Sequence, residues 1–119
     1  MKSGSKILLI DDNADFRLLL RLLLQDHGYI VYEAEDGAAG LAMYEQEHPH
    51  MAIVDLNTPK MNGIEFSKQI KAKEPAFPIL MITGYAPFVS PTDLLSAGAN
   101  EFLQKPVDVK SVMEVVERM

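Results

Sequence analysis

The sequence contains no cysteine among its 119 residues. Neither a disulfide framework nor a thiolate metal site is therefore available to it, and this composition fits a reducing compartment. No apolar run is long enough to cross a bilayer, and the opening MKSGSK lacks the apolar segment of a secretory signal. We expect a cytoplasmic location, with residues 1–5 as a disordered N-terminal segment or a cloning remnant and residues 6–119 as one domain.

Positive charge is also scarce in this sequence. Lys and Arg number 11 against 17 Asp and Glu, which gives a formal net charge of −6. A domain this acidic lacks the electrostatic surface of a nucleic-acid-binding protein, and it fits poorly with anionic membranes. Apolar residues, in contrast, are plentiful. They make up 48% of the chain, which is enough for the core of one compact domain of this length.

Five short apolar segments alternate with five segments of helical spacing. The apolar segments are rich in Ile, Leu and Val without polar alternation, which is typical of strands buried on both faces. The predicted strands are residues 6–10, 29–34, 51–54, 78–82 and 101–103. The predicted helices are residues 14–25, 38–47, 64–73, 91–97 and 107–119.

This alternation predicts an α/β fold with a five-stranded parallel sheet covered by helices on both faces. Because the crossovers are right-handed, few topologies remain. We expect the flavodoxin-like order 2-1-3-4-5, a three-layer sandwich with five helices. In that order the first and third strands are neighbours, and the winding of the chain reverses between them.

The third predicted strand raises a question, because it stops on a carboxylate, Asp55, that is costly to bury without a partner. In open α/β sheets, ligands bind beyond the carboxyl ends of the strands, where the winding reverses. The other strands at that edge are followed by Asp11 and Asp12, by Thr83 and by Lys105. We therefore expect these side chains to converge on Asp55.

Three converging carboxylates repel one another unless a cation joins them. Oxygen ligands without histidine or cysteine favour a hard ion, so we expect Mg²⁺ or Mn²⁺ at this edge. Lys105 can pair with Asp55 or with a phosphoryl oxygen, and Thr83 can donate a hydrogen bond to another such oxygen. Since a carboxylate can also act as a nucleophile, the set suits phosphorylation of an aspartate.

Four motifs lie in order on the successive strand ends: ILLIDDN, IVDLNTPKMNG, MITGYA and AGANEFLQKP. With these motifs the chain resembles, from residue 6 to residue 119, a receiver domain of the two-component response-regulator family, like that of the chemotaxis regulators. The resemblance implies a phosphorylation-dependent signalling switch. Such a domain is not an enzyme with a separate substrate, because it catalyses only its own aspartyl phosphorylation and dephosphorylation.

The resemblance also implies partners. A sensor histidine kinase or a histidine phosphotransfer protein would supply the phosphoryl group. The new charge would change the surface formed by the fourth helix, fifth strand and fifth helix. A downstream output domain or protein, or a second copy in a phosphorylation-dependent homodimer, would recognise that surface. We expect neither direct nucleic-acid binding nor membrane binding by this domain.

The matching motifs imply a role for each residue of the site. By resemblance Asp55 is the phosphoacceptor. Asp11, Asp12 and Asp55 would hold Mg²⁺ together with the backbone carbonyl of Asn57. Thr83 and Lys105 would contact the phosphoryl group.

Further positions match the switch of the family. Thr83 and Phe102 would move toward the site on activation, and the Lys105–Pro106 peptide bond is typically cis in relatives. Two loop positions depart from the usual family pattern, with Thr58 in place of Met and Asn62 in place of Asp. A bulky Tyr85, two residues after Thr83, predicts slow self-dephosphorylation.

The first predicted helix carries an additional signal. A wide apolar stripe predicts its core face: Phe16, Leu19, Leu20, Leu23 and Leu24. Leu18 and Leu22 lie off that stripe, one turn apart, where receiver relatives usually carry polar residues. We expect Leu18 and Leu22 to be exposed and to dock a helical partner such as a kinase or phosphotransfer bundle.

Two alternatives share features with this interpretation. A flavin-binding electron carrier has the same topology, but it needs a Ser, Thr or Gly-rich phosphate loop where this chain has DDNADF. A phosphatase of the haloacid-dehalogenase type also uses a nucleophilic aspartate, but it needs a second acid where this chain has Asn57. A degenerate receiver acting only as a scaffold is a third alternative, which the complete residue set disfavours.

Overall fold

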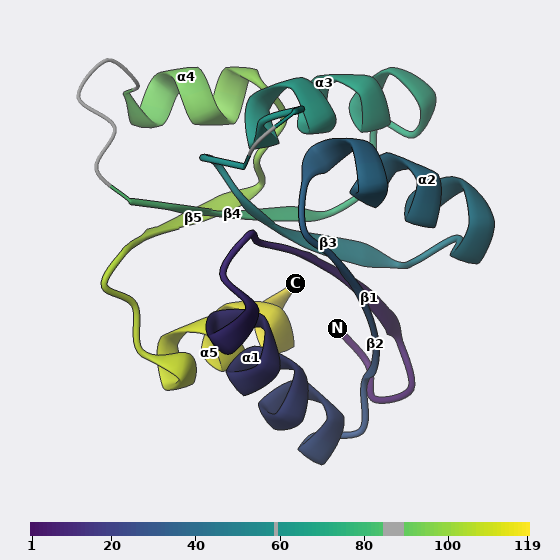
Figure 1. Cartoon of the computed structure of the whole chain (residues 1–119), viewed down its shortest axis with the longest axis vertical. Helices are drawn as coiled ribbons and strands as arrows, with labels where there is room; N and C mark the ends of the chain where they lie inside the picture. The colour runs from purple at the N-terminus through teal and green to yellow at the C-terminus, as the bar shows by residue number, and fades with distance from the viewer. Residues whose placement is uncertain (59, 85–89) are drawn as a thin grey trace.

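The fold is a five-stranded parallel sheet in the order β2-β1-β3-β4-β5 with helices on both faces (Figure 1). In this computed structural model, residues 1–58, 60–84 and 90–119 are described. The strands are β1 (Lys6–Ile10), β2 (Ile30–Ala34), β3 (Met51–Asp55), β4 (Ile79–Thr83) and β5 (Glu101–Gln104). The helices are α1 (Ala14–Asp26), α2 (Gly37–Glu47), α3 (Gly63–Lys73), α4 (Pro91–Ser96) and α5 (Val109–Arg118). The predicted fold class and strand order are confirmed.

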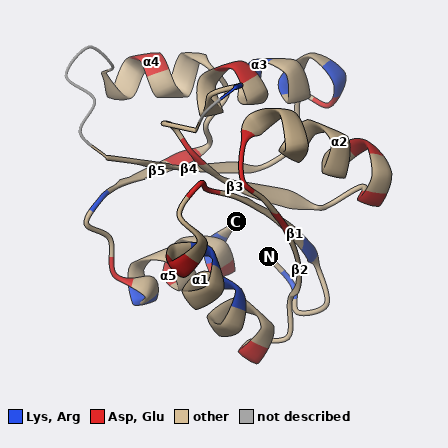
Figure 2. Cartoon of the chain, in the orientation of Figure 1, with Lys and Arg blue, Asp and Glu red and all other residues tan. Residues whose placement is uncertain are grey.

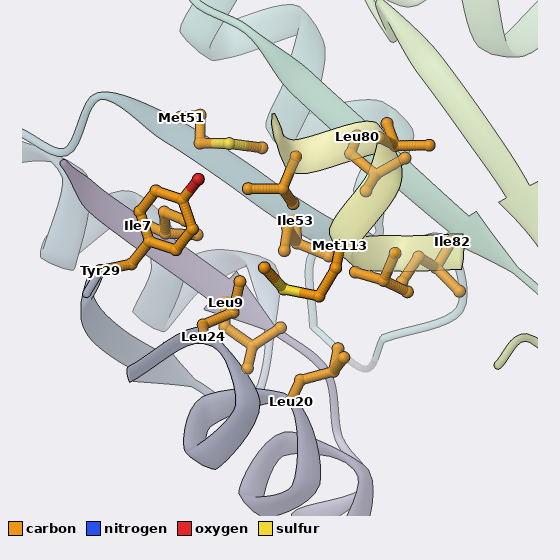
Figure 3. Close-up of a cluster of buried hydrophobic side chains, with 13 residues drawn as sticks. Ile7, Leu9, Leu20, Leu24, Tyr29, Met51, Ile53, Leu80, Ile82 and Met113 are labelled. Carbon is orange, nitrogen blue, oxygen red and sulfur yellow. The ribbon is translucent and has the colours of Figure 1, made fainter. Parts of the chain in front are cut away.

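The helices divide between the two faces of the sheet. Figure 1 shows α1 and α5 on one face and α2, α3 and α4 on the other. Under α1 and α5, strand residues such as Ile53 pack against Leu20 and Leu24 of α1 and Val112 of α5 (Figure 3 shows the first three). Under α2 and α3 a second cluster forms around Phe66. Since β3 and β4 are buried on both faces, their apolar runs carry no polar alternation.

The strand register brings the carboxyl ends of the central strands to one edge. Ile10 of β1 pairs with Val54 of β3, and Asp55 pairs with Ile82 of β4. Asp55 is the last residue of β3, one residue beyond the predicted end of that strand. Residues that follow β1, β3 and β4 in the sequence therefore meet in space.

Two details of the helices differ from the expectation. The last helix begins at Val109 and not at residue 107, because the Asp108 side chain caps it by accepting a hydrogen bond from Ser111 N–H at 2.8 Å. Leu19 of α1 was expected in the core, and that prediction is wrong, since 53% of this residue is exposed. It lies about 100° around the helix from the fully buried Leu20.

The N-terminal segment contacts the rest of the domain, whereas the sequence suggests disorder for residues 1–5. The Met1 amino group donates hydrogen bonds to the carbonyls of Val116, at 2.8 Å, and Glu117, at 3.0 Å. The Tyr29 hydroxyl donates to the Met1 carbonyl at 2.7 Å. These bonds bring the segment against the end of α5, which a reading of its polar composition alone does not reveal.

Among the described residues, no helix combines the length and the apolar character that a membrane span requires.

Candidate functional site

Acidic side chains gather where β1 and β3 enter their loops, which are red at these points in Figure 2. Asp11 follows β1 and is 1% exposed, and Asp55 ends β3 and is 4% exposed. Asp12 is exposed beside them. One carboxylate oxygen from each of the three lies within 4.8 Å of the others. In the described part of the chain, no other three acidic or histidine side chains form such a group.

The ammonium group of Lys105 faces the two buried carboxylates. Its Nζ lies 3.2 Å from Asp11 Oδ2 and 3.4 Å from Asp55 Oδ2. The side chain extends from the loop after β5, and the Lys105 backbone N–H donates to the Thr83 carbonyl at 2.6 Å. The following peptide bond, Lys105–Pro106, is cis. The four strand ends named from the sequence therefore meet at one place.

Both buried carboxylates are oriented by the loops that follow them. Asp11 Oδ1 accepts a hydrogen bond from Asn13 N–H at 2.8 Å, and Asp55 Oδ1 accepts one from Asn57 N–H at 3.1 Å. In each case the backbone two residues later fixes one oxygen and leaves Oδ2 directed at Lys105. Asn13 also caps α1 through its own side chain, which accepts from Phe16 N–H.

The pKa values at the site reflect burial and neighbouring charge. Burial raises the pKa of Asp11, and the charge of Asp55 adds to this rise against the opposing effects of Asn13 N–H and Lys105. For Lys105, burial lowers the pKa, but the charges of Asp11 and Asp55 outweigh burial, so the net pKa is raised. Lys105 is therefore protonated. The charged form of Asp11 is destabilised, and a bound cation would stabilise it.

The site fits a hard divalent cation. Its donors are carboxylate oxygens without nitrogen or sulfur, close enough together to share one ion. Two of them are buried, where a second carboxylate raises the free energy of the charged state. Asn57 is exposed at the same edge, with its backbone N–H bound to Asp55.

The residues matched to the family switch lie on the β4 and β5 side of the site. Thr83 is 8% exposed, and its hydroxyl donates to the carbonyl of Gly84 at 3.1 Å. Phe102 is half-buried and packs against a small cluster that includes Met81 and Leu94. Tyr85 lies outside the described residues.

The two loop positions that depart from the family pattern have local roles. The Thr58 hydroxyl donates to the Met61 carbonyl at 2.7 Å, and Asn62 caps α3 by accepting from Glu65 N–H at 2.9 Å. Both bonds shape the loop that follows Asp55.

Sequence reasoning missed two neighbours of the acidic cluster. Phe16, taken as core, is only partly buried, and its ring centroid lies 4.9 Å from Lys105 Nζ. Arg17 donates from Nη1 to the Asp11 carbonyl at 2.6 Å and pairs through Nε with Glu33 at 3.3 Å. Phe16 and Arg17 lie close to the Asp11–Asp12 pair in the sequence, and this is the signal that could have identified them.

Part of the exposed surface of α1 is apolar. Leu18 is 44% exposed and Leu22 is 54% exposed, as expected from their place off the core stripe. The exposed Leu19 lies between them in the sequence and enlarges this surface. We call these three leucines the α1 leucine strip.

Comparison with known proteins decides the family. A family model described as "Response regulator receiver domain" matches residues 7–117. The chain belongs to this family. It is thus a receiver domain of two-component signalling.

Relatives of the receiver domain include both short and long proteins. The chemotaxis protein CheY of Bacillus subtilis is 31% identical over 114 residues, which cover 95% of this chain and 95% of CheY. The alkaline phosphatase synthesis transcriptional regulatory protein PhoP of the same organism is 36% identical over 109 residues, covering 92% of this chain. Those residues are 45% of PhoP, so the chain spans less than half the length of such relatives.

The structural comparison agrees with the family assignment. A CheY-like response regulator receiver domain protein from Methanospirillum hungatei JF-1 has a TM-score of 0.91 and 30% sequence identity. The match covers 98% of this chain and 93% of that protein.

Proposed function

We propose that this receiver domain is a switch that accepts a phosphoryl group on Asp55 from a phosphohistidine partner. The single observation that best supports this is the arrangement of Asp55, which is buried at a strand end, oriented by Asn57 N–H and paired with Lys105. An inert strand-end carboxylate could remain exposed to water, whereas Asp55 is buried beside a second buried carboxylate, Asp11, and shares the Lys105 ammonium with it. The proposal includes a cytoplasmic location, with which the lack of cysteine is consistent.

In the transfer step, a carboxylate oxygen of Asp55 attacks the phosphorus of the phosphohistidine. A phosphorus–oxygen bond forms, the phosphorus–nitrogen bond breaks, and its electron pair remains on the departing imidazole. The ammonium of Lys105, already directed at Asp55 Oδ2, is placed to stabilise charge on the phosphoryl oxygens. Hydrolysis of the resulting acyl phosphate returns Asp55 to its starting state.

Asp11, Asp12 and Asp55 are the residues that would hold Mg²⁺ or Mn²⁺, with the backbone carbonyl of Asn57 as a further ligand. When bound, the ion supplies positive charge that neutralises the carboxylates and the phosphoryl oxygens. The convergence of three carboxylate oxygens within 4.8 Å supports this assignment.

Phosphorylation would be transmitted through Thr83 and Phe102. Among the described residues, the Thr83 hydroxyl donates to the adjacent Gly84 carbonyl, a bond that it could exchange for one to a phosphoryl oxygen. Phe102 lies on β5 next to Met81 of β4 and is half-buried, so part of its ring is still exposed and could become buried. The surface of α4, β5 and α5 would then change, and an output domain, an output protein or a second copy would bind it.

The phosphoryl donor would be a sensor histidine kinase or a histidine phosphotransfer protein that docks a helix on the α1 leucine strip. The exposure of Leu18, Leu19 and Leu22 on the helix that follows Asp11 and Asp12 supports this docking. Relatives such as PhoP are named as transcriptional regulatory proteins and exceed this chain in length, which supports an attached output domain.

The test is incubation with acetyl phosphate and Mg²⁺, followed by intact-mass and peptide mass spectrometry. We expect the wild type to gain one phosphoryl group on the peptide that contains Asp55. Asp55→Asn should gain none, and omission of Mg²⁺ should abolish labelling of the wild type. A wild-type chain that stays unmodified, or one labelled equally well after Asp55→Asn, would contradict the proposed function.

A further inference from the structure

The ammonium group of Lys105 has a third neighbour besides its two carboxylates. Its Nζ lies 4.9 Å from the centroid of the Phe16 ring, within the range of a cation–π interaction. Phe16 belongs to the first turn of α1, and Lys105 comes from the loop after β5. The two residues therefore join separate parts of the fold across the edge of the acidic site.

Phe16 and Lys105 share the lining of a hollow of about 510 Å³ that opens beside the carboxylates. Its lining residues are Asn13, Phe16, Gly84, Lys105, Pro106 and Val107. Phe16 is only partly buried: it packs against the core beneath α1, and it also lines the hollow. An ammonium held against this ring faces the hollow and the carboxylates together.

The carboxylates and the phenyl ring, the two kinds of partner of Lys105, respond differently to a divalent ion. A cation shared by Asp11, Asp12 and Asp55 weakens the attraction of those carboxylates for Lys105, because two positive charges then compete for them. The face of a phenyl ring attracts an ammonium but is a poor ligand for a strongly hydrated ion such as Mg²⁺. Phe16 thus keeps its hold on Lys105 when the carboxylates lose theirs.

We propose that Phe16 is a positioning residue whose aromatic face holds the Lys105 ammonium at the site while the carboxylates bind the divalent ion. The inference rests on the proposed function and adds a residue that acts through Lys105. Leucine at this position would fill similar space but would lack the negative ring face. Without the ring as an alternative partner, the ammonium would stay on Asp11 and Asp55 and compete with the ion, so we expect Phe16→Leu to weaken both Mg²⁺ binding and phosphorylation.

The sharpest test replaces Phe16 with mono-, di- and trifluorophenylalanine, which weakens the ring face stepwise at nearly constant shape. Mg²⁺ binding is measured by titration calorimetry, and the phosphorylation rate with acetyl phosphate is measured at saturating Mg²⁺. Since an exposed cation–π contact is modest, the full series should change each quantity by about two- to fivefold, in order of fluorine content. The same series at Phe77, which packs edge-on against Tyr44 on the opposite face, is the matched control.

A second readout needs no phosphoryl transfer. In the wild type, the ε-methylene protons of Lys105 should show an upfield ring-current shift by NMR. Phe16→Leu should abolish this shift, whereas Phe16→Tyr, which keeps an aromatic ring, should retain it. Fluorination that leaves Mg²⁺ affinity and rate unchanged, or a Lys105 signal indifferent to Phe16→Leu, would overturn the inference. A wild-type chain that is never phosphorylated would overturn the proposed function instead, and the NMR result would still decide the Phe16 contact.

Discussion

At the scale of single residues, Lys105 is the centre of the site, since one ammonium compensates two nearly buried carboxylates. Truncating a partner of a buried ion pair is costly, because it leaves charge buried without compensation. The Lys105 side chain is 29% exposed, so water lowers this cost below that of a fully enclosed pair. The stability of the metal-free domain and its response to Mg²⁺ are therefore linked through this residue.

We predict that Lys105→Met lowers the free energy of unfolding by about 1–2 kcal/mol without Mg²⁺. The same substitution should increase the stabilisation that Mg²⁺ provides, because no ammonium competes for Asp11 and Asp55. Urea unfolding with and without Mg²⁺ measures both effects. Lys110→Met, an exposed lysine on α5, is the control. Equal Mg²⁺ stabilisation of wild type and Lys105→Met would contradict the competition.

Tyr44 gives a pH dependence with a definite sign. Burial, the 2.6 Å hydrogen bond from its hydroxyl to Glu74 and nearby negative charge raise the pKa of Tyr44 to about 12, above its ordinary value of 10.0. The unfolded chain therefore loses this proton first as the pH rises. Stability from the neutral hydroxyl is complete below pH 10.0 and is lost as the pH approaches about 12.

We predict that Tyr44→Phe makes the decline of stability between these pH values shallower, because the substituted residue has no proton to lose. Urea unfolding midpoints across this range, compared with the wild type, test this prediction. Near neutral pH the variant should be destabilised by about 1 kcal/mol through the lost hydrogen bond to Glu74. Parallel curves for the two proteins would show that Tyr44 is not the source.

At the scale of elements, Asn100 links α3 and β4 at the end of the sheet opposite the site. Its side-chain oxygen accepts from the N–H of Ile79, at 3.0 Å, and from Lys71 Nζ, at 2.9 Å. Ile79 is fully buried, so its N–H has no access to water if that acceptor is removed. The loop before β5 thus satisfies the first backbone donor of β4.

We predict that Asn100→Ala lowers the free energy of unfolding by about 1–3 kcal/mol, the cost of a buried donor without a partner. Asn100→Asp keeps the acceptor and should retain most of the stability. Lys71→Met removes only the second donor and should cost less than Asn100→Ala. Chemical denaturation of the three variants makes the comparison, and a larger loss for Lys71→Met than for Asn100→Ala would refute this account.

At the scale of the whole molecule, the acidic site and the α1 leucine strip are joined by a short stretch of chain. Asp11 and Asp12 precede α1, which begins at Ala14, and the strip lies on that helix. A protein donor must contact the surface around the site, whereas a small phosphodonor needs only the site itself. Substitutions on the strip should therefore slow phosphorylation by a protein donor and leave phosphorylation by a small phosphodonor unchanged.

We predict that Leu18→Glu combined with Leu22→Glu slows phosphoryl transfer from the phosphohistidine partner at least tenfold, roughly the loss of a docking hot spot. Phosphorylation by acetyl phosphate should be unchanged, because the acidic cluster is intact. Rapid-quench transfer assays with both donors measure the ratio. Leu95→Glu, at an exposed leucine of α4, is the matched control. An equal effect on both donors would rule out docking at the strip.

The sequence was sufficient to predict the sheet and the convergence of Asp11, Asp55 and Lys105. Parallel strands present their carboxyl ends at one edge, so residues distant in the sequence must meet there. The rotation of α1 about its axis was less accessible, because two neighbouring stripes of leucine compete for the core. Only packing against β1, β2 and α5 decides that Leu20 is buried and Leu19 is exposed.

Other features depend on contacts between side chains that no periodicity encodes. Phe16 fits an apolar stripe equally well as a core residue or as a wall beside Lys105, and the reach of the lysine side chain decides between them. The bond from Arg17 to the Asp11 carbonyl depends in the same way on Glu33 of β2. Such details follow from the fold once its elements are in place.

The small cluster beneath α4 has a consequence for how the domain deforms. This helix has six residues and one buried side chain, Leu94, whereas α5 buries four. The free energy that opposes local opening rises with apolar contact, so α4 should be less costly to displace than α5. Helix α4 rests on Met81 and the half-buried Phe102, and Met81 pairs with Val54, the residue before Asp55. A small electrostatic change at that strand end therefore acts next to a helix that buries fewer side chains than α5 does.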